Sequence, residues 1–210
     1  MKKVKPYKTV QGAIKALDNG GRFYNLASKA NDGNITPAEL AKAAGVVSNV
    51  QSSILYLEMS LMALDEGAKN QVLSHLSGEL KIKYESNKPQ LFTPASARSH
   101  AENGRSAIIT GIPTLVDSKT QFFGFIMIPI VSGSVTTFAM VPLIDEYDIY
   151  ELRDSESEED CFIAHKRGFT KLSAQLTRCG GMIKELKAKP EEEQASGKFL
   201  EMTHYSPVDP

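Results

Sequence analysis

An uncharged stretch in the middle of the chain constrains the fold more than any other feature. It runs from Phe122 to Ile144 and reads FFGFIMIPIVSGSVTTFAMVPLI. Its length would suffice for a membrane helix, which needs about 20 apolar residues. Pro129 and Pro142 disfavour a helix, because proline removes a backbone donor and clashes with the preceding turn. The other residues are mostly Ile, Val, Thr and Phe, which are typical of strands.

The centre of this stretch predicts a β-hairpin. Turn residues, Ser132-Gly133-Ser134, separate two apolar arms of similar sequence, IMIPIV and AMVPLI. The flanks hold no cluster of Lys or Arg that would orient a membrane span. We therefore expect two paired strands, with the prolines at edges or bulges. Because the arms are apolar at nearly every residue, both of their faces need to be covered.

Length and charge set broad limits on the chain. Its 210 residues are enough for one large domain or two small ones. Residues 1–90 carry a net charge of +4 and residues 91–210 a net charge of −5, which together give −1 for the whole chain. The overall charge therefore favours neither nucleic acid nor a membrane surface as a partner.

Neither a metal centre nor a cofactor is predicted. The two cysteines, Cys161 and Cys179, and the four scattered histidines lack metal-ligand spacing. The chain contains no P-loop, GxGxxG or HExxH motif. The first residues are basic and lack the apolar segment of a signal peptide, so we expect reduced thiols in a cytoplasmic protein.

Residues 1–88 are predicted to be helical. Short helical patterns cover TVQGAIKALD and RFYNLASKA, and the stop signal Asn19-Gly20-Gly21 lies between them. Apolar residues then recur at spacings of three and four from Val47 to Leu64, and a second long helix is expected over residues 66–85. These last two helices would form a helical hairpin.

The stretch SKANDGNITPAE predicts a turn that leads into a capped helix. Thr36 is the N-cap, Pro37 fits the first helical position, and Glu39 completes a capping box. The same stretch resembles an EF-hand loop, in which Asp32, Asn34, Thr36 and Glu39 would be calcium ligands. Because Ser28 and Ala30 stand where that loop has carboxylates, the capped helix is the favoured interpretation.

The next stretch, ELAKAAGVVSNVQSSILYL, resembles a helix-turn-helix. Asn49, Gln51, Ser52 and Ser53 would be the residues that read base edges. The second helix offers no Lys or Arg to hold phosphates, and phosphate contacts dominate affinity for DNA. We therefore interpret it as a core helix.

From Arg105 onward the pattern is that of strands. The segments are SAIITGIPTLV, the two hairpin arms, EYDIYELRD, DCFIAHKR and GMIKELKA. A short helix is expected in FTKLSAQLTRCGG, before the last strand. Over roughly residues 105–189 this order resembles an OB-fold, a five-stranded barrel whose relatives bind oligonucleotides and oligosaccharides. An SH3-like barrel or an open sheet is the alternative.

The predicted organisation is therefore α+β, with a helical domain followed by a small antiparallel β-barrel or curled sheet, OB-like or SH3-like. The helical domain covers residues 1–88, a linker residues 89–104, and the β-domain residues 105–189. Residues 190–210 read as a flexible acidic tail, since they include three consecutive glutamates and little apolar sequence.

A basic run after the strand DCFIAHKR is the candidate site for single-stranded nucleic acid. Its residues are His165, Lys166, Arg167, Lys171 and Arg178. The aromatic residues near them in sequence are Tyr147, Tyr150, Phe162 and Phe169. Charge combined with stacking is what single strands require, although aromatic side chains in strands also serve as core or cross-strand partners. The acidic stretch 145–160 would repel phosphates and could contact a basic partner.

These observations predict a binding protein rather than an enzyme. We expect an interaction or assembly module that uses its apolar hairpin to bind a protein partner or a second copy. Single-stranded nucleic-acid binding by an OB-like barrel is the alternative. No Ser, Cys or His stands in a nucleophile context, so the sequence gives no positive evidence for catalysis. An enzyme whose site is not recognisable in the sequence is a further alternative. No membrane association is expected.

Overall fold

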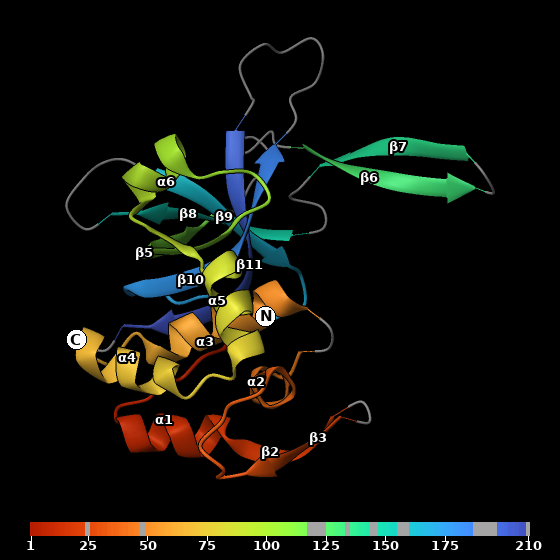
Figure 1. Ribbon diagram of the computed structural model, residues 1–210. Helices are drawn as coiled ribbons and strands as arrows, with labels where there is room; N and C mark the ends of the chain where they lie inside the picture. The colour runs from red at the N-terminus through yellow and green to blue at the C-terminus, as the bar shows by residue number, and fades with distance from the viewer. Residues whose placement is uncertain are drawn as a thin grey trace. The chain divides into compact units, whose positions relative to one another are not determined.

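A computed structural model describes residues 1–23, 26–46, 49–116, 125–132, 135–142, 147–154, 160–186 and 197–208. The chain divides into two compact units (Figure 1). The helical unit is Lys3–Pro89, and the β unit is Met1–Lys2 together with Gln90–Pro210. The protein is a mixed α/β chain in which helices come first, as predicted, and a seven-stranded sheet follows.

Five helices and a small hairpin make up the helical unit. The helices are α1 (Val10–Leu17), α2 (Pro37–Ala44), α3 (Val50–Leu61), α4 (Glu66–Ser74) and α5 (Gly78–Asn87). At each start, an N-cap side chain accepts a hydrogen bond from a backbone N–H of the first turn; the caps are Thr9, Thr36, Asn49, Asp65 and Ser77. The predicted capping box of Thr36 and Glu39 is confirmed, and Gly45 ends α2 in the left-handed conformation.

The predicted apolar seam lies at the centre of the helical unit. Ile54, Leu57 and Leu61 of α3 are fully buried and join one cluster with residues of α1, α2, α4 and α5. Helix α3 also packs against α5, so the two regions expected in the helical hairpin do meet.

A charged group is buried beside this seam. The Glu58 carboxylate is fully buried and accepts hydrogen bonds from the ammonium of Lys69 and from the hydroxyl of Tyr84, the latter at 2.7 Å. Lys69 itself is 9 % exposed. Desolvation of both charges is unfavourable, and it is offset only because each has a partner of the opposite charge. Burial, followed by the Glu58 contact, raises the pKa of Tyr84, which keeps that hydroxyl protonated.

Two predictions in the helical unit are wrong. The stretch RFYNLASKA is not helical, because β2 (Asn19–Phe23) and β3 (Leu26–Ala30) form an antiparallel hairpin. The predicted stop at Gly20 and Gly21, which both have positive φ, lies within β2, and the stretch after it pairs back on this strand up to Phe23↔Leu26. Residues 66–85 form two helices rather than one. The break lies at Leu76, which pairs in a parallel bridge with Ile35.

The β unit contains one short helix and most of the strands. They are β1 (Lys2–Lys3), β4 (Gln90–Phe92), α6 (Pro94–His100), β5 (Ser106–Leu115), β6 (Phe125–Ser132), β7 (Val135–Pro142), β8 (Tyr147–Arg153), β9 (Asp160–Lys166), β10 (Thr177–Leu186) and β11 (Gly197–Pro207). Seven of these strands form the main sheet, in the order β1-β11-β10-β5-β8-β9, with β4 beside β5.

The main sheet curls into a partial ring. Strand β9 also pairs with β11, in parallel, which links the five strands β5, β8, β9, β11 and β10 in a cycle. This closing contact spans only three residue pairs, from Phe199↔Phe162 to Glu201↔Ala164. Of the two predicted alternatives, a barrel or a curled sheet, the barrel is wrong. The sheet is partly ringed and is not a barrel, because so short a contact leaves most of β9 and β11 unpaired with each other.

Strand alternation gives the sheet two buried clusters. Tyr150 and Leu152 of β8 belong to the larger one, together with residues of β5, β9, β10, β11 and α6. Tyr147 and Ile149, one position out of phase on the same strand, belong to a smaller cluster with Phe199. Both faces of β8 are therefore apolar and buried.

The structure differs from the sequence prediction at three segments of the β unit. Residues 89–104, expected in a linker, contain β4 and α6. Residues 169–176, expected to be helical, contain no helix, and Thr177–Gly181 pair with β5 instead. Residues 197–207, expected in a flexible tail, form β11, in which Leu200 and Met202 join the larger cluster.

The uncharged stretch forms the predicted hairpin. Strands β6 and β7 pair antiparallel over eight residue pairs, from Phe125↔Pro142 to Ser132↔Val135, and Figure 1 shows them as a two-stranded ribbon. Gly133 and Ser134, the centre of the predicted turn, lie outside the described residues. In the described part of the chain, β6 and β7 form a sheet of their own.

Candidate functional site

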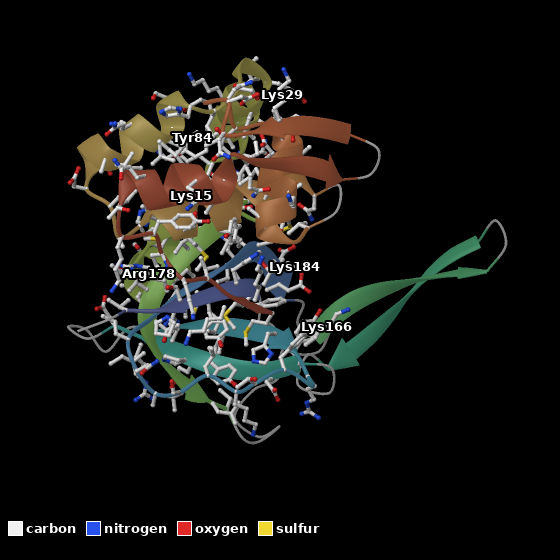
Figure 2. The ribbon with its side chains drawn as sticks, turned by 90° about the horizontal axis from the view of Figure 1, so that it is seen from below. Lys15, Lys29, Tyr84, Lys166, Arg178 and Lys184 are labelled. Carbon is white, nitrogen blue, oxygen red and sulfur yellow. The ribbon has the colours of Figure 1, made fainter. Side chains whose placement is uncertain are left out.

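The structure brings four of the five predicted nucleic-acid-binding residues together. His165 and Lys166 end β9, and Arg167 and Lys171 lie in the connection to β10. Lys166, Arg167 and Lys171 are exposed, as charged residues that hold phosphates must be. The fifth, Arg178, lies on β10, and Figure 2 shows it on the opposite side of the β unit from Lys166.

His165 is buried at the base of this connection. Its side chain is 1 % exposed and its ring stacks on that of Tyr150, with centroids 5.6 Å apart and planes 27° apart. The ring Nδ1 lies 2.9 Å from the carbonyl oxygen of Lys166. Among the residues that the structure describes, the Nε2 atom has no hydrogen-bond partner. His165 is therefore not a surface cation, as the sequence had suggested, but a buried ring with one unsatisfied nitrogen.

Phe169 projects from the same connection. It is 48 % exposed, and its ring meets that of His165 edge-on, with centroids 6.4 Å apart and planes 73° apart. Gly168 precedes it with φ of +93°, a conformation that favours glycine. The guanidinium of Arg167 lies 3.8 Å from the Asp148 carboxylate, which partly offsets its positive charge.

Lys184 is a basic residue of this region that the sequence analysis missed. Figure 2 places it near Lys166, and its ammonium is 2.6 Å from a Glu201 carboxylate oxygen. The Tyr147 hydroxyl donates to the other Glu201 oxygen at 2.6 Å. Burial raises the pKa of Glu201, but Lys184, Tyr147 and the nearby Lys166 outweigh burial and lower it. Only the strand register reveals this network, because its residues are far apart in sequence.

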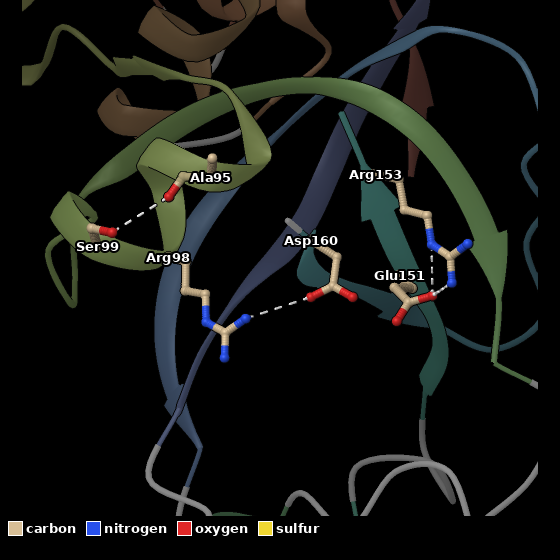
Figure 3. A network of polar contacts seen from close by, with 6 residues as sticks. All are labelled: Ala95, Arg98, Ser99, Glu151, Arg153 and Asp160. Atoms are coloured by element: carbon tan, nitrogen blue, oxygen red, sulfur yellow. Dashed lines mark hydrogen bonds and ion pairs between the residues drawn. The ribbon is translucent and has the colours of Figure 1, made fainter. Parts of the chain in front are cut away.

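The acidic stretch contributes a carboxyl pair at the other end of β8 and β9. Glu151 forms a side-chain hydrogen bond with Asp160, which raises the pKa of Glu151. Figure 3 shows two arginines beside this pair: Arg153 bonds Glu151 at 2.6 Å, and Arg98 of α6 lies 3.9 Å from Asp160. Because both carboxyl groups have cationic partners, the pair reads as a surface ion network.

The residues of the EF-hand-like stretch are engaged within the helical unit. The two carboxylate oxygens of Glu39 accept from the Gly20 backbone N–H at 2.6 Å and from the Thr36 backbone N–H at 3.0 Å. Asp32 accepts from the backbone N–H of Asn34 at 3.0 Å. Among the described residues, no group of three or more His, Cys, Asp or Glu side chains could hold a metal ion. The Glu39 carboxylate already links strand β2 to the capped start of α2.

The residues that would read base edges in the helix-turn-helix interpretation lie at the start of α3. Asn49 accepts from the backbone N–H of Ser52 at 2.9 Å, and the Ser53 hydroxyl donates to the Asn49 carbonyl at 3.1 Å. These groups therefore cap their own helix. Because Ile54, Leu57 and Leu61 of α3 are core residues, α3 lacks the exposed length of a recognition helix.

Both cysteines are free and buried, Cys161 on β9 and Cys179 on β10. Burial, and secondly the charge of Asp160, raises the pKa of Cys161 to about 12. Burial likewise raises the pKa of Cys179. Since the thiolate is the reactive form, neither thiol is activated as a nucleophile.

Comparison with known proteins does not assign the chain to a family. No family model matches it, and no curated protein is similar to it in sequence. In the described residues, the structure contains no helix with the length and apolar character that crossing a membrane requires.

Proposed function

We propose that this protein is an assembly module that self-associates through the β6–β7 hairpin. The observation that carries the proposal is the pairing of this ribbon. Eight residue pairs join β6 to β7, and in the described part of the chain neither strand pairs with any other. An isolated two-stranded ribbon is at best marginally stable in water, so it needs a surface to cover it.

The sequence of the ribbon supports an interface. No charged residue occurs from Phe122 to Ile144. Natural proteins usually place charges, Lys above all, on strands that must stay unpaired. An uncharged apolar ribbon without such protection is typical of a surface that is covered in the working protein.

A second copy of the chain is the occupant that fits best. Two identical ribbons are chemically matched, and a two-fold interface uses the same patch on both copies. With eight residues per strand, the ribbon is about 27 Å long and about 10 Å wide. One face then offers roughly 270 Å² per copy, so a face-to-face dimer would bury about 540 Å² through the ribbons. Surface beside the ribbons would have to supply the rest of the roughly 1,000 Å² that a specific interface needs.

The prolines favour packing through the faces over pairing through the edges. Pro129 stands opposite Phe138, and Pro142 stands opposite Phe125. Proline cannot donate to a neighbouring strand, which is why it occurs at sheet edges. With one proline on each strand, addition of further strands is disfavoured, and a closed dimer is favoured over an open chain of copies.

Light scattering after size exclusion tests this proposal. We expect the wild-type protein to have twice the 23.0 kDa of one chain. Ile128→Glu places a charge in the middle of β6 and should reduce the mass to that of one chain. The control is Ile82→Glu, which changes an isoleucine that is 71 % exposed on α5 and should leave the dimer intact. A wild-type mass of one chain, or an Ile128→Glu variant that remains dimeric, would overturn the proposal.

A second candidate function, single-stranded nucleic-acid binding, is favoured by the strand order. Support comes from the cycle β5-β8-β9-β11-β10, with its one parallel pair between β9 and β11, which resembles the pairing of strands in an OB-fold. An OB-fold is itself a partly open barrel, and it binds oligonucleotides over its second and third strands. Those strands correspond to β8 and β9, which carry His165, Lys166 and Asp148.

Salt dependence of oligonucleotide binding tests this second candidate. Fluorescence anisotropy of a labelled mixed-sequence single strand should show saturable binding at low salt. With Lys166, Arg167 and Lys171 each neutralising one phosphate, log K should fall against log[salt] with a slope of about −2. A flat titration at low salt would remove this candidate and leave self-association untouched.

A further inference from the structure

We infer that the β9–β10 connection holds one nucleobase of a single strand, stacked on Phe169 and hydrogen-bonded to His165. The inference rests on the second candidate function and specifies where a base would bind. We call this place, formed by Tyr150, His165 and Phe169 with the flanking Lys166 and Lys171, the Phe169 subsite.

The unsatisfied nitrogen of His165 is the first observation. Its Nδ1 faces the carbonyl of Lys166 at 2.9 Å, and a carbonyl only accepts, so Nδ1 carries the hydrogen. In a neutral imidazole the other nitrogen, Nε2, is then an acceptor. That acceptor has no donor within the described residues, although the side chain is 1 % exposed. Buried polar atoms without a partner are rare and call for an explanation.

The aromatic arrangement is the second observation. The rings of Tyr150 and His165 stack, whereas Phe169 meets His165 edge-on. An edge-on contact leaves a face of the Phe169 ring for another partner, and Phe169 is 48 % exposed. A base on that face would lie beside His165. Backbone rotation at Gly168 would move Phe169 together with the base stacked on it. An N–H on the edge of that base could then reach Nε2 of His165.

The charges around the subsite favour different positions for the base and for the phosphates. Lys166 and Lys171 are exposed on either side of Phe169. Asp148 stands opposite His165 in the β8–β9 register, and its carboxylate is near Arg167. A phosphate beside Asp148 would be repelled, whereas a base N–H would be attracted. Phosphates therefore belong at the two lysines and the base at the rings.

These requirements point to an unpaired base. The partner must offer a planar face and an N–H donor at once, together with phosphates close by. In a duplex the bases are stacked on each other and their edges are paired, so only a single strand offers both.

The test compares a base-containing probe with a base-free one. Anisotropy would be measured for labelled oligothymidylate and for an abasic oligomer of equal length and charge, each titrated with the full chain. One stacked base should make the wild-type protein prefer oligothymidylate by about 5- to 150-fold. Phe169→Ala should abolish the preference and Phe169→Tyr should restore it, because tyrosine offers the same ring face.

Two further variants separate the roles. Leu176→Ala is the matched control, since Leu176 is apolar and 36 % exposed in the same connection, and it should change nothing. His165→Phe keeps a ring against Tyr150 but removes Nε2, so it should lower affinity for oligothymidylate and leave affinity for the abasic probe unchanged.

The outcomes distinguish the inference from the function on which it rests. If the wild-type protein binds neither probe at low salt, single-stranded binding and the subsite both fail. If it binds both with steep salt dependence and Phe169→Ala keeps the preference, binding stands and the subsite alone is overturned. Thermal unfolding of each variant verifies that it is folded, which matters most for His165→Phe, because His165 is buried whereas Phe169 and Leu176 are partly exposed.

Discussion

The helical unit and the β unit differ in the sequence separation of the interactions that determine their secondary structure. Each helix of the helical unit begins at a cap whose partner lies three residues away. The β unit depends on distant pairings: β10 joins β5 from Thr177↔Gly111 to Met182↔Ser106, and β11 reaches back to β9. Local signals therefore set the first unit, whereas the second forms only when remote segments meet.

The two units also differ in how they treat buried polar groups. In the helical unit, the buried carboxylates of Glu39 and Glu58 both accept hydrogen bonds from nearby donors. In the β unit, Nε2 of His165 is unsatisfied within the described residues. The side-chain oxygens of Asn19 in the helical unit and of Gln90 in the β unit are likewise unsatisfied within the described residues. We infer that the buried charges of the helical unit maintain its structure, while the unsatisfied ring of the β unit marks a binding position.

The largest expected effect concerns the charged group in the helical core. Lys69→Met leaves the Glu58 carboxylate buried without a cation, which should cost about 3–5 kcal/mol of the free energy of unfolding. Hydrogen exchange read by mass spectrometry would follow peptides of the two units separately. Protection should fall in residues 50–87. The double variant Glu58→Leu with Lys69→Met should recover part of the loss, and a single variant as stable as wild type would contradict the role given to this pair.

Acid should act on the β unit through His204. This β11 side chain is 3 % exposed, and burial, then Lys2 and the N-terminal amine, lowers its pKa from 6.5 to about 4. Between those pH values the unfolded chain binds a proton that the folded chain does not. Stability should therefore be complete above pH 6.5 and fall as pH drops towards 4, by up to about 3 kcal/mol.

Denaturant melts at several pH values measure this loss. His204→Gln should remove most of the pH dependence in this window, whereas His100→Gln, on the exposed side of α6, should leave it unchanged. A wild-type slope that persists in His204→Gln would assign the acid sensitivity to other groups.

Two glycine-to-alanine substitutions compare how well the two units tolerate an added Cβ atom. An added Cβ at Gly181 would lie 2.1 Å from the backbone oxygen of Glu201, at a bulge between β10 and β11. Gly181→Ala should therefore destabilise the β unit by about 3 kcal/mol. At Gly78, the first residue of α5, nothing lies within 4 Å of the added atom. Gly78→Ala should be neutral or stabilise by up to about 1 kcal/mol, and equal effects in urea melts would contradict the contrast.

The smallest expected effect is at the capping box. Thr36→Ala removes the side-chain acceptor for the Glu39 N–H and should cost about 1 kcal/mol. Thr170→Ala, at an exposed position of the β9–β10 connection, is the matched control and should have no effect. Circular dichroism at 222 nm during urea unfolding would measure both, and a neutral Thr36→Ala would show that Glu39 alone holds the turn.

Local chemistry explains which parts of the fold the sequence could predict. The start of α2 follows from Thr36, Pro37 and Glu39, which lie within four positions of one another. The stretch RFYNLASKA has the short apolar spacing of a helix, but its residues pair across the chain, with Arg22↔Ala27 and Phe23↔Leu26 in an antiparallel hairpin. The break at Leu76 depends on Ile35, a residue too distant for any local pattern to include.

Long-range pairing explains the errors in the β unit. Residues 197–207 look like a polar tail in isolation, and only pairing with β10 and β9 shows why Leu200 and Met202 are core residues. The same holds for the candidate site. The run from His165 to Arg167 was visible in the sequence, but the burial of His165 and the proximity of Lys184 to Lys166 depend on strand register.

Self-association through the hairpin is tested most directly by sedimentation equilibrium of the unmodified chain over about a 100-fold range of concentration, since mass action would reveal any dimer. We predict a mass of twice 23.0 kDa at the higher concentrations, falling towards that of one chain only on dilution. A mass of 23.0 kDa throughout would contradict the assembly role and leave the uncharged ribbon to be covered by a different partner.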